Sequence, residues 1–279
     1  MNDADCVHFL QEALPRLRLR WPGFRKVRKQ VCKRVGRRLR ELGLTDISAY
    51  ADYLAAHPEE WQTLDRLCRI SISRFYRDRG VFDALRDVVL PNLADAAMRR
   101  GDDTIAIWSA GCASGEEPYS LKLLWTMSLV QQFPDLALRI VATDADERLL
   151  KRAADGDYPR GCLKELPRAW IAKAFEDRGD DHRFRPNFRS GITFVHQDIR
   201  NEVPDGPFDL ILCRNLAFTY FDLAVQRSVL ESLAGRLRVG GYLVIGKHES
   251  LPATTPRFSV LGQRLPIYRR TAQTVPQAA

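Results

Sequence analysis

The chain has 279 residues, which is enough for one or two domains, each with its own hydrophobic core. Hydrophobic residues make up 45% and charged residues 28%, and this balance excludes a mostly disordered polypeptide. The 43 Lys and Arg residues outnumber the 35 Asp and Glu residues, so the formal charge of +8 points to a nucleic acid, an anionic membrane or an acidic protein as partner. The apolar runs are too short to span a bilayer, and the acidic N-terminus is unlike a signal peptide, so no membrane insertion is expected.

The cysteines are too widely spaced for a CxxC zinc motif or a dense disulfide framework, since they stand at positions 6, 32, 68, 112, 162 and 213. We interpret all six as reduced thiols of a cytoplasmic protein. The five histidines are equally scattered, so no metal site is expected.

The N-terminal part of the chain is predicted to be helical. Residues 16–40 contain twelve Lys and Arg and no acid, and the apolar positions there recur every four residues at Val27, Val31, Val35 and Leu39. Gly43 ends this basic helix, and further helices are predicted over about 47–56 and 58–70. We therefore expect a small all-helical domain with its linker over residues 1–95.

After Gly101 the pattern alternates between strand and helix. Buried strands are predicted at 104–110, 138–144, 192–198, 208–215 and 242–248, with a final pair inside 258–270. Helices are predicted at 118–133, from 145 to about 154, and at 222–237, where Gly240 and Gly241 end the last of them. This alternation predicts an α/β domain over 96–279 with a mostly parallel sheet and crossover helices.

A glycine loop, AGCASGEEP at 110–118, follows the first strand, where an open parallel sheet binds ligands. Gly111 and Gly115 permit tight turning, but their spacing is not the GxGxxG of dinucleotide sites. Glu116 and Glu117 open the following helix and would repel a phosphate. They favour a cationic ligand such as S-adenosylmethionine, which carries an ammonium, a sulfonium and no phosphate.

Two further acids follow neighbouring strands. Asp144 could accept hydrogen bonds from ribose hydroxyls, and Asp198 could accept one from an adenine amino group. Each acid alone could instead be an ordinary helix cap. Together with the glycine loop, they predict a cofactor site.

Several strings resemble the CheR family of chemotaxis-receptor methyltransferases: ISRFYRDRGVF (72–82), IWSAGCASGEEPYSL (107–121), ATD (142–144), DGDYP (155–159) and ILCRN (211–215). The resemblance extends over residues 24–270. It implies a class I, Rossmann-like methyltransferase fold behind a helical N-terminal domain, with a small β-subdomain at 160–191. It also implies transfer of a methyl group from S-adenosylmethionine to glutamate side chains of receptor proteins, leaving S-adenosylhomocysteine.

The same resemblance implies roles for residues around the cofactor. Ser71 and Ser73 match family positions near the cofactor, and Arg77 matches the arginine beside the transferred methyl group. Either Glu116 or Glu117 would hold the methionine ammonium, with Glu116 preferred.

Asp144 would then hold the ribose, and Asp198 would lie near the adenine. Arg214 and Asn215, at the end of the fourth strand, would complete the cofactor site, and Asn215 would also take part in catalysis with Arg77 and Tyr220.

The chain departs from the family pattern on the acceptor side. It reads CRNLAFTYF, with one residue more than the family before the tyrosine, so either Tyr220 or Thr219 fills the active-site position. It also reads GKHESLP at 246–252, where the family has a glycine-histidine-serine-glutamate string. These departures leave open a small-molecule acceptor, and a module that binds the cofactor without catalysis is a further alternative.

The positive charge is localised. Without the twelve basic residues of 16–40, 31 basic and 35 acidic residues remain. We expect the basic helix 25–40, including Arg34, Arg37 and Arg38, to bind an acidic helical receptor protein, although such a face could simply be solvated. The Asn/Asp-Pro-Pro-aromatic motif of DNA methyltransferases is missing after the fourth strand, which argues against nucleic acid as the partner.

Overall fold

The computed structural model describes residues 2–252, 257–262 and 265–272, and it divides into two compact units. A helical unit comprises Met1–Ser71 with Leu216–Gln226, and a sheet unit comprises Ile72–Asn215 with the chain from Arg227 onward. The boundary between the two units therefore lies at Ser71, whereas the sequence prediction placed the end of the helical domain and its linker at residue 95. The reason is that apolar side chains of 75–97, such as Phe82 and Leu90, are buried in the core of the sheet unit.

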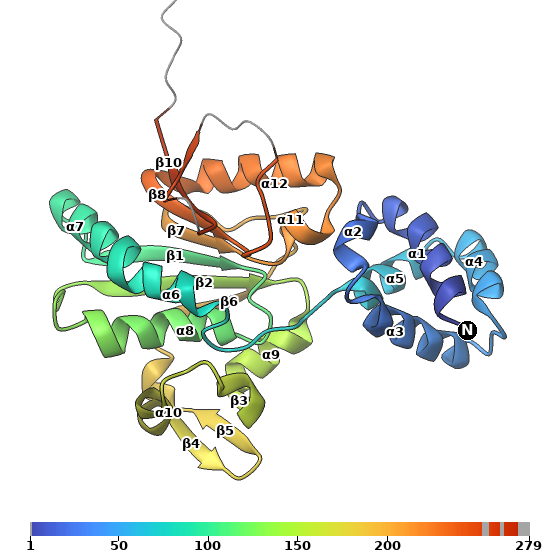
Figure 1. Cartoon of the computed structure of the whole chain (residues 1–279), viewed down its shortest axis with the longest axis horizontal. Helices are drawn as coiled ribbons and strands as arrows, with labels where there is room; N and C mark the ends of the chain where they lie inside the picture. Colours follow the sequence, from blue (N-terminus) through green and yellow to red (C-terminus); the bar gives the residue numbers. More distant parts are fainter. Residues whose placement is uncertain (1, 253–256, 263–264, 273–279) are drawn as a thin grey trace, which may run out of the picture. The chain divides into compact units, whose positions relative to one another are not determined.

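The helical unit contains α1 (Asp3–Arg16), α2 (Trp21–Phe24), α3 (Arg28–Glu41), α4 (Ile47–Ala56) and α5 (Glu60–Cys68), and it also includes α11 (Ala217–Tyr220), which packs on α2 (Figure 1). The basic helix is α3. It buries Val31, Val35 and Leu39, as the four-residue spacing predicted, and leaves its basic side chains around that stripe.

Cys6 of α1 and Cys32 of α3 form a disulfide. The interpretation of all six cysteines as reduced thiols is therefore wrong for this pair, while Cys68, Cys112 and Cys162 are free thiols. The pairing depends on two helices that pack against each other, and at a sequence separation of 26 the two cysteines carry no local signal of it.

The sheet unit is built on a seven-stranded sheet with the order β6-β2-β1-β7-β8-β10-β9. Its strands are β1 (Thr104–Ala110), β2 (Ala137–Asp144), β6 (Ile192–His196), β7 (Phe208–Cys213), β8 (Leu237–Ile245), β9 (Phe258–Val260) and β10 (Ile267–Arg270). The first five are parallel, while β10 runs antiparallel to both β8 and β9. This confirms the predicted fold class.

Helices cover the sheet and connect its strands: α6 (Arg79–Ala84), α7 (Leu90–Arg100), α8 (Glu116–Leu124), α9 (Glu147–Asp155) and α12 (Leu223–Arg236), with π-helical turns at Leu85–Val89 and Trp125–Leu129. In Figure 1, α8 and α9 lie below the strands of this sheet and α12 above them. Because β1, β2, β6 and β7 run parallel, their carboxyl ends lie at one edge of the sheet, where the predicted site residues follow the strands. No described helix is long and apolar enough to cross a membrane.

The last parallel strand begins earlier than predicted. Gly240 and Gly241 lie inside β8 rather than ending the preceding helix, at a register shift opposite Phe208 and Leu210. Gly240 has φ +84°, and a Cβ on Gly241 would lie 2.7 Å from the carbonyl oxygen of Asp209. The glycine pair therefore permits an irregular strand to pass close to β7.

A second, antiparallel sheet with the order β3-β5-β4 is formed by β3 (Asp157–Pro159), β4 (Phe175–Arg178) and β5 (Asp181–Phe184), and it lies apart from the main sheet in Figure 1. A 3₁₀ turn (Arg160–Leu163), α10 (Arg168–Ala174) and a 3₁₀ turn (Pro186–Phe188) complete this segment. It begins at Asp157 and occupies the region in which a subdomain was expected. Phe75 joins it to the unit by edge contacts with Tyr158 and Phe175.

Candidate functional site

The glycine loop turns sharply from β1 into α8. Gly111 and Gly115 have φ values of +74° and +86°, which favour glycine. The backbone N–H groups of Gly111 and Cys112 donate to the carbonyl oxygen of Thr143 at 2.8 and 2.9 Å, which ties the loop to the end of β2. A Cβ on Gly115 would lie 2.9 Å from the Cβ of Ala153, so this position also needs glycine for close packing.

Three of the predicted acids gather around this loop. Burial raises the pKa of the Cys112 thiol well above its usual value, and the charges of Asp144, Glu117 and Glu116 raise it further. The thiol is therefore protonated and packed. The carboxylates around it create a negative environment that suits a cation.

Glu116, in the first turn of α8, is 2% exposed. Burial raises its pKa, against the lowering effect of the helix backbone N–H and of hydrogen bonds with Ser73 and Ser114. Its Oε2 atom is buried and has no hydrogen-bond partner among the described residues. A buried acceptor without a partner is costly, and a cationic N–H donor of a ligand would satisfy it.

Glu117 has a different environment. Its Oε1 accepts a hydrogen bond from Ser109 Oγ at 2.7 Å, and its Oε2 accepts one from Arg214 Nη1 at 3.1 Å. Both oxygens are thus bonded within the protein. The two adjacent glutamates, which the sequence left as alternatives, therefore have distinct roles in the structure.

Asp144 holds the glycine loop in place. Its Oδ2 accepts the backbone N–H of Ala113 at 2.8 Å, and its Oδ1 accepts that of Asp146 at 2.9 Å. A carboxylate oxygen accepts two hydrogen bonds, so these contacts are compatible with additional ribose hydroxyls.

Asp198 forms an ion pair with Arg200, at 2.6 Å between Nη2 and Oδ2, and accepts the backbone N–H of Arg200 at 3.0 Å. Arg200 was not predicted as a partner of Asp198. Its position two residues after the acid could have indicated the ion pair, because a side chain at that spacing can fold back onto the carboxylate.

Arg77 and Asn215 lie in segments with unusual backbone. Arg77 is half-buried, and its Nη1 donates to the carbonyl oxygen of Ile72 at 2.6 Å. Asn215 has φ +54°, and its N–H donates to Oε2 of Glu249 at 2.8 Å. The same Glu249 oxygen accepts the N–H of Gly246 at 2.6 Å.

Glu249 was missed as a site residue, although it lies in the GKHESLP string. A Cβ on Gly246 would lie 2.7 Å from Oδ1 of Asn215, so this glycine allows the ends of β7 and β8 to approach. Ser71 and Tyr220 belong to the helical unit. Ser71 is exposed, and the Tyr220 ring lies 5.1 Å from that of Phe24.

Among the residues that the structure describes, no group of His, Cys, Asp and Glu could hold a metal ion. The candidate cofactor site thus combines a tightly turned glycine loop, a buried carboxylate oxygen without a partner among the described residues, and further acids at the strand ends. This donor set fits the ammonium and ribose hydroxyls of S-adenosylmethionine.

Comparison with known proteins places the whole arrangement in a family. Residues 71–266 match the family described as "CheR methyltransferase, SAM binding domain", and residues 26–65 match "CheR methyltransferase, all-alpha domain". A "Chemotaxis protein methyltransferase" of Listeria monocytogenes is 37% identical over 185 residues, which cover 66% of this chain and 67% of that protein. The protein of the same description from Escherichia coli is 31% identical over 251 residues, covering 85% and 81%.

A further relative is an "Uncharacterized 104.1 kDa protein" of Rhodobacter capsulatus, 31% identical over 240 residues. These cover 86% of this chain, which spans only a quarter of that relative's length. The match to the cofactor-binding domain extends over more than half of the chain and includes the loop, the acids and Arg77. The chain therefore belongs to the CheR methyltransferase family and is an S-adenosylmethionine-dependent methyltransferase.

Proposed function

We propose that this protein transfers methyl groups to glutamate carboxylates on the acidic signalling helices of a chemoreceptor-type protein in the cytoplasm. Its relatives from Listeria and Escherichia are described as chemotaxis protein methyltransferases. The observation that supports the proposal is a row of basic side chains on α3 that form no ion pair with the residues that the structure describes, which matches an acidic helix better than a small molecule.

The bound cofactor supplies a methyl group on a positively charged sulfur. Oε2 of Glu116 accepts from the cofactor ammonium, because this oxygen is buried and otherwise unsatisfied. Asp144 accepts from the ribose, and its bonds to Ala113 and Asp146 orient the carboxylate. Asp198 contributes on the adenine side while Arg200 fixes its direction.

A glutamate acceptor needs no general base, since its pKa of about 4.3 leaves it ionised at neutral pH. The protein has to align the carboxylate with the methyl group and remove water from it. Arg77 supplies the cation that orients the acceptor carboxylate. A catalytic role is also proposed for Tyr220, or for Thr219 in its place.

Seven basic residues lie in α3. Arg28 pairs with Asp3 at 3.0 Å, and the other six fall into two sets. Arg34 donates to the carbonyl oxygens of Leu67 and Arg69, Arg38 pairs with Glu60 at 2.8 Å, and Arg37 lies 3.8 Å from Glu41. These three arginines, the ones expected to bind the partner, therefore hold the helical unit together or are partly neutralised.

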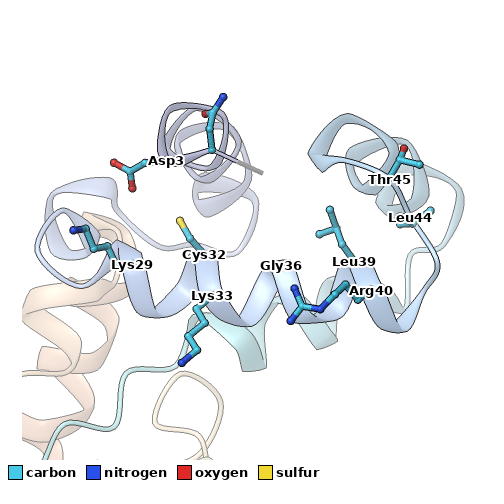
Figure 2. A pocket seen from close by; sticks show the side chains of 10 residues that line it. Asp3, Lys29, Cys32, Lys33, Gly36, Leu39, Arg40, Leu44 and Thr45 are labelled. Carbon is cyan, nitrogen blue, oxygen red and sulfur yellow. The ribbon is translucent and has the colours of Figure 1, made fainter.

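The second set consists of Lys29, Lys33 and Arg40, which form no ion pair within the described part of the chain. They line a pocket of about 510 Å³ along α3, together with Gly36 and Asp3, and Figure 2 shows the side chains that line it. Their spacing of four and seven residues makes one continuous stripe. We assign the docking of an acidic helix to this groove, defined by Lys29, Lys33, Gly36 and Arg40.

Replacing Lys29, Lys33 and Arg40 together by glutamine is expected to raise the KM for the acceptor protein about tenfold. The reason is the loss of three attractive charges, each contributing up to about 0.5 kcal/mol at an exposed surface. Cofactor affinity and kcat are expected to stay within twofold, and the rise of KM with salt is expected to flatten. Steady-state kinetics between 50 and 300 mM salt measure these values.

The matched control replaces Arg99, Arg139 and Arg227, three exposed arginines outside α3, by glutamine. It removes the same net charge and is expected to leave KM unchanged. An equal rise in both triple variants would assign the effect to overall charge, and no rise in either would remove the groove from the docking surface.

The acceptor is tested with tritium-labelled S-adenosylmethionine, supplied with receptor cytoplasmic fragments or with a metabolite extract. We expect label in the receptor band that is released as methanol by mild alkali, because carboxylate esters hydrolyse there and methylated amines do not. Label only in the extract would support a small-molecule acceptor. Calorimetric binding of the cofactor with no labelled product would support a non-catalytic module.

A further inference from the structure

We infer that Arg214 is a positioning residue, which fixes Arg77 for methyl transfer by clamping the segment 72–78 onto the first turn of α8. This inference rests on the role proposed for Arg77. It assigns Arg214 a function through Asp78 and Glu117, whereas the sequence suggested a direct role in cofactor binding.

The side chain of Arg214 is only 3% exposed and forms three hydrogen bonds within the sheet unit. Nη1 donates to Glu117 Oε2 at 3.1 Å, while Nη2 donates to Asp78 Oδ2 at 2.7 Å and to the carbonyl oxygen of Arg77 at 2.9 Å. Its guanidinium also lies 5.5 Å from the ring centroid of Phe82. One side chain thus joins the end of β7, the start of α8 and the backbone of Arg77.

The clamped segment has backbone conformations that require such support. Tyr76 and Asp78, on either side of Arg77, have φ values of +55° and +63°. Residues other than glycine persist in this region only when the surrounding structure holds them. The backbone N–H of Tyr76 donates to Ser120 Oγ at 2.9 Å, and that hydroxyl donates to the carbonyl oxygen of Glu116 at 2.6 Å.

Arg77 is therefore held on both sides against α8, by Ser120 before it and by Arg214 after it. Glu116, the proposed ammonium site, and Glu117, which accepts a hydrogen bond from Arg214, are adjacent residues in the first turn of α8. This arrangement couples the direction of Arg77 to the element that binds the cofactor.

The geometry demands an arginine rather than a positive charge alone. The planar guanidinium reaches Glu117, Asp78 and the Arg77 carbonyl group at once, while a lysine ammonium at the same position is a single point charge on a flexible stem. A lysine substitution therefore keeps the charge and loses the clamp. Asp78→Asn keeps the shape of the partner and loses only its charge.

We expect Arg214→Lys to lower kcat about 100-fold and Asp78→Asn about tenfold, with cofactor affinity within threefold of the wild type, because a displacement of about 1 Å is costly to methyl transfer. The double variant is expected to be no worse than Arg214→Lys alone. In an Arg77→Ala background, Arg214→Lys is expected to cause no further loss. Single-turnover kinetics and cofactor titration measure these effects.

Hydrogen exchange of the amides of residues 73–78 gives a readout that does not depend on the acceptor. Exchange is expected to rise at least tenfold in Arg214→Lys and Asp78→Asn. Asp209→Asn serves as the control, since Asp209 is a buried partner of Arg100 and of the Ala106 N–H and lies outside the clamp. It is expected to lower the melting temperature without changing this exchange or kcat.

Arg214 has a buried Nε atom for which the described part of the chain offers no partner, and a direct contact with the cofactor carboxylate is the competing assignment. A loss of cofactor affinity in Arg214→Lys as large as the loss of kcat would overturn the inference. Unchanged exchange in both clamp variants would overturn it as well. If the protein labels no receptor, the proposed acceptor fails, while the exchange result still decides the clamp.

Discussion

Replacement of Glu116 by glutamine is expected to weaken binding of S-adenosylmethionine about 100-fold while making the cofactor-free protein more resistant to unfolding. The loss of affinity follows from removing a charge-assisted hydrogen bond in a buried site, which contributes about 2–3 kcal/mol. Glu116 is 2% exposed, and its Oε2 lacks a partner among the described residues. The cofactor ammonium is the partner that we propose for this oxygen.

The gain in stability follows from the direction of the pKa shift. Burial raises the pKa of Glu116, so the folded protein binds this proton more readily than the unfolded chain does. Its contribution to stability is complete below the pKa of the unfolded chain and is lost as the pH rises through the raised pKa of the folded state. At neutral pH the ionised, buried group therefore destabilises the cofactor-free protein, and glutamine removes this penalty.

The pH dependence of binding separates this explanation from a general loosening of the loop. Wild-type affinity for the cofactor is expected to fall as the pH is lowered through the raised pKa of Glu116, whereas the glutamine variant is expected to show a flatter profile. Isothermal titration calorimetry from pH 5 to 8 and thermal unfolding without cofactor measure the two effects. Glu147→Gln is the matched control, an exposed glutamate in the first turn of α9.

If Glu116→Gln binds the cofactor as the wild type does, the ammonium site lies elsewhere. A variant that loses both affinity and thermal stability would instead show that Glu116 has a structural role.

Arg77→Ala is expected to lower kcat about 100-fold and to change the cofactor dissociation constant less than threefold. In the role proposed for Arg77 the guanidinium orients the acceptor carboxylate, and alignment of the reacting groups accounts for a large part of the barrier in such a displacement. Single-turnover methylation with saturating cofactor measures the chemical step, and cofactor titration measures binding. Arg77→Lys keeps the charge but not the planar guanidinium, so its kcat is expected to lie between those of the wild type and Arg77→Ala.

Arg79→Ala is the control, since Arg79 is an exposed arginine two residues away that lies 3.8 Å from Asp83. It is expected to retain wild-type turnover. Should Arg77→Ala lose cofactor affinity in proportion to kcat, Arg77 binds the carboxylate of the cofactor and another group orients the acceptor.

The local sequence pattern predicted the strands of the sheet well. Runs of β-branched and apolar residues such as TIAIWSA stand in β1 over the predicted range, because a strand buried on both faces needs apolar side chains throughout. The start of β8 could not be predicted, because Gly240 and Gly241 look like a helix end and become a strand irregularity only through their contact with β7.

The boundary between the units illustrates a similar limit. Residues 79–100 are helical, as are the residues before Ser71, so periodicity alone groups them together. Their apolar faces are buried in the core around the main sheet, and a side chain's partner in the core is not encoded in its own periodicity.

The sequence by itself determined the family, the alternating α/β architecture and the concentration of positive charge in residues 16–40, and it predicted a cofactor site at the glycine loop. These properties depend on residue types at short spacing, which act over one turn or one strand. Only the tertiary structure distinguishes the surroundings of Glu116 and Glu117, because neighbours on a helix point about 100° apart and Arg214 bonds to just one of them. It likewise paired Cys6 with Cys32, and it divided the basic side chains of α3 into those that hold the unit together and those of the groove. In each case the deciding partner lies far away in the chain, and only packing brings it within contact distance.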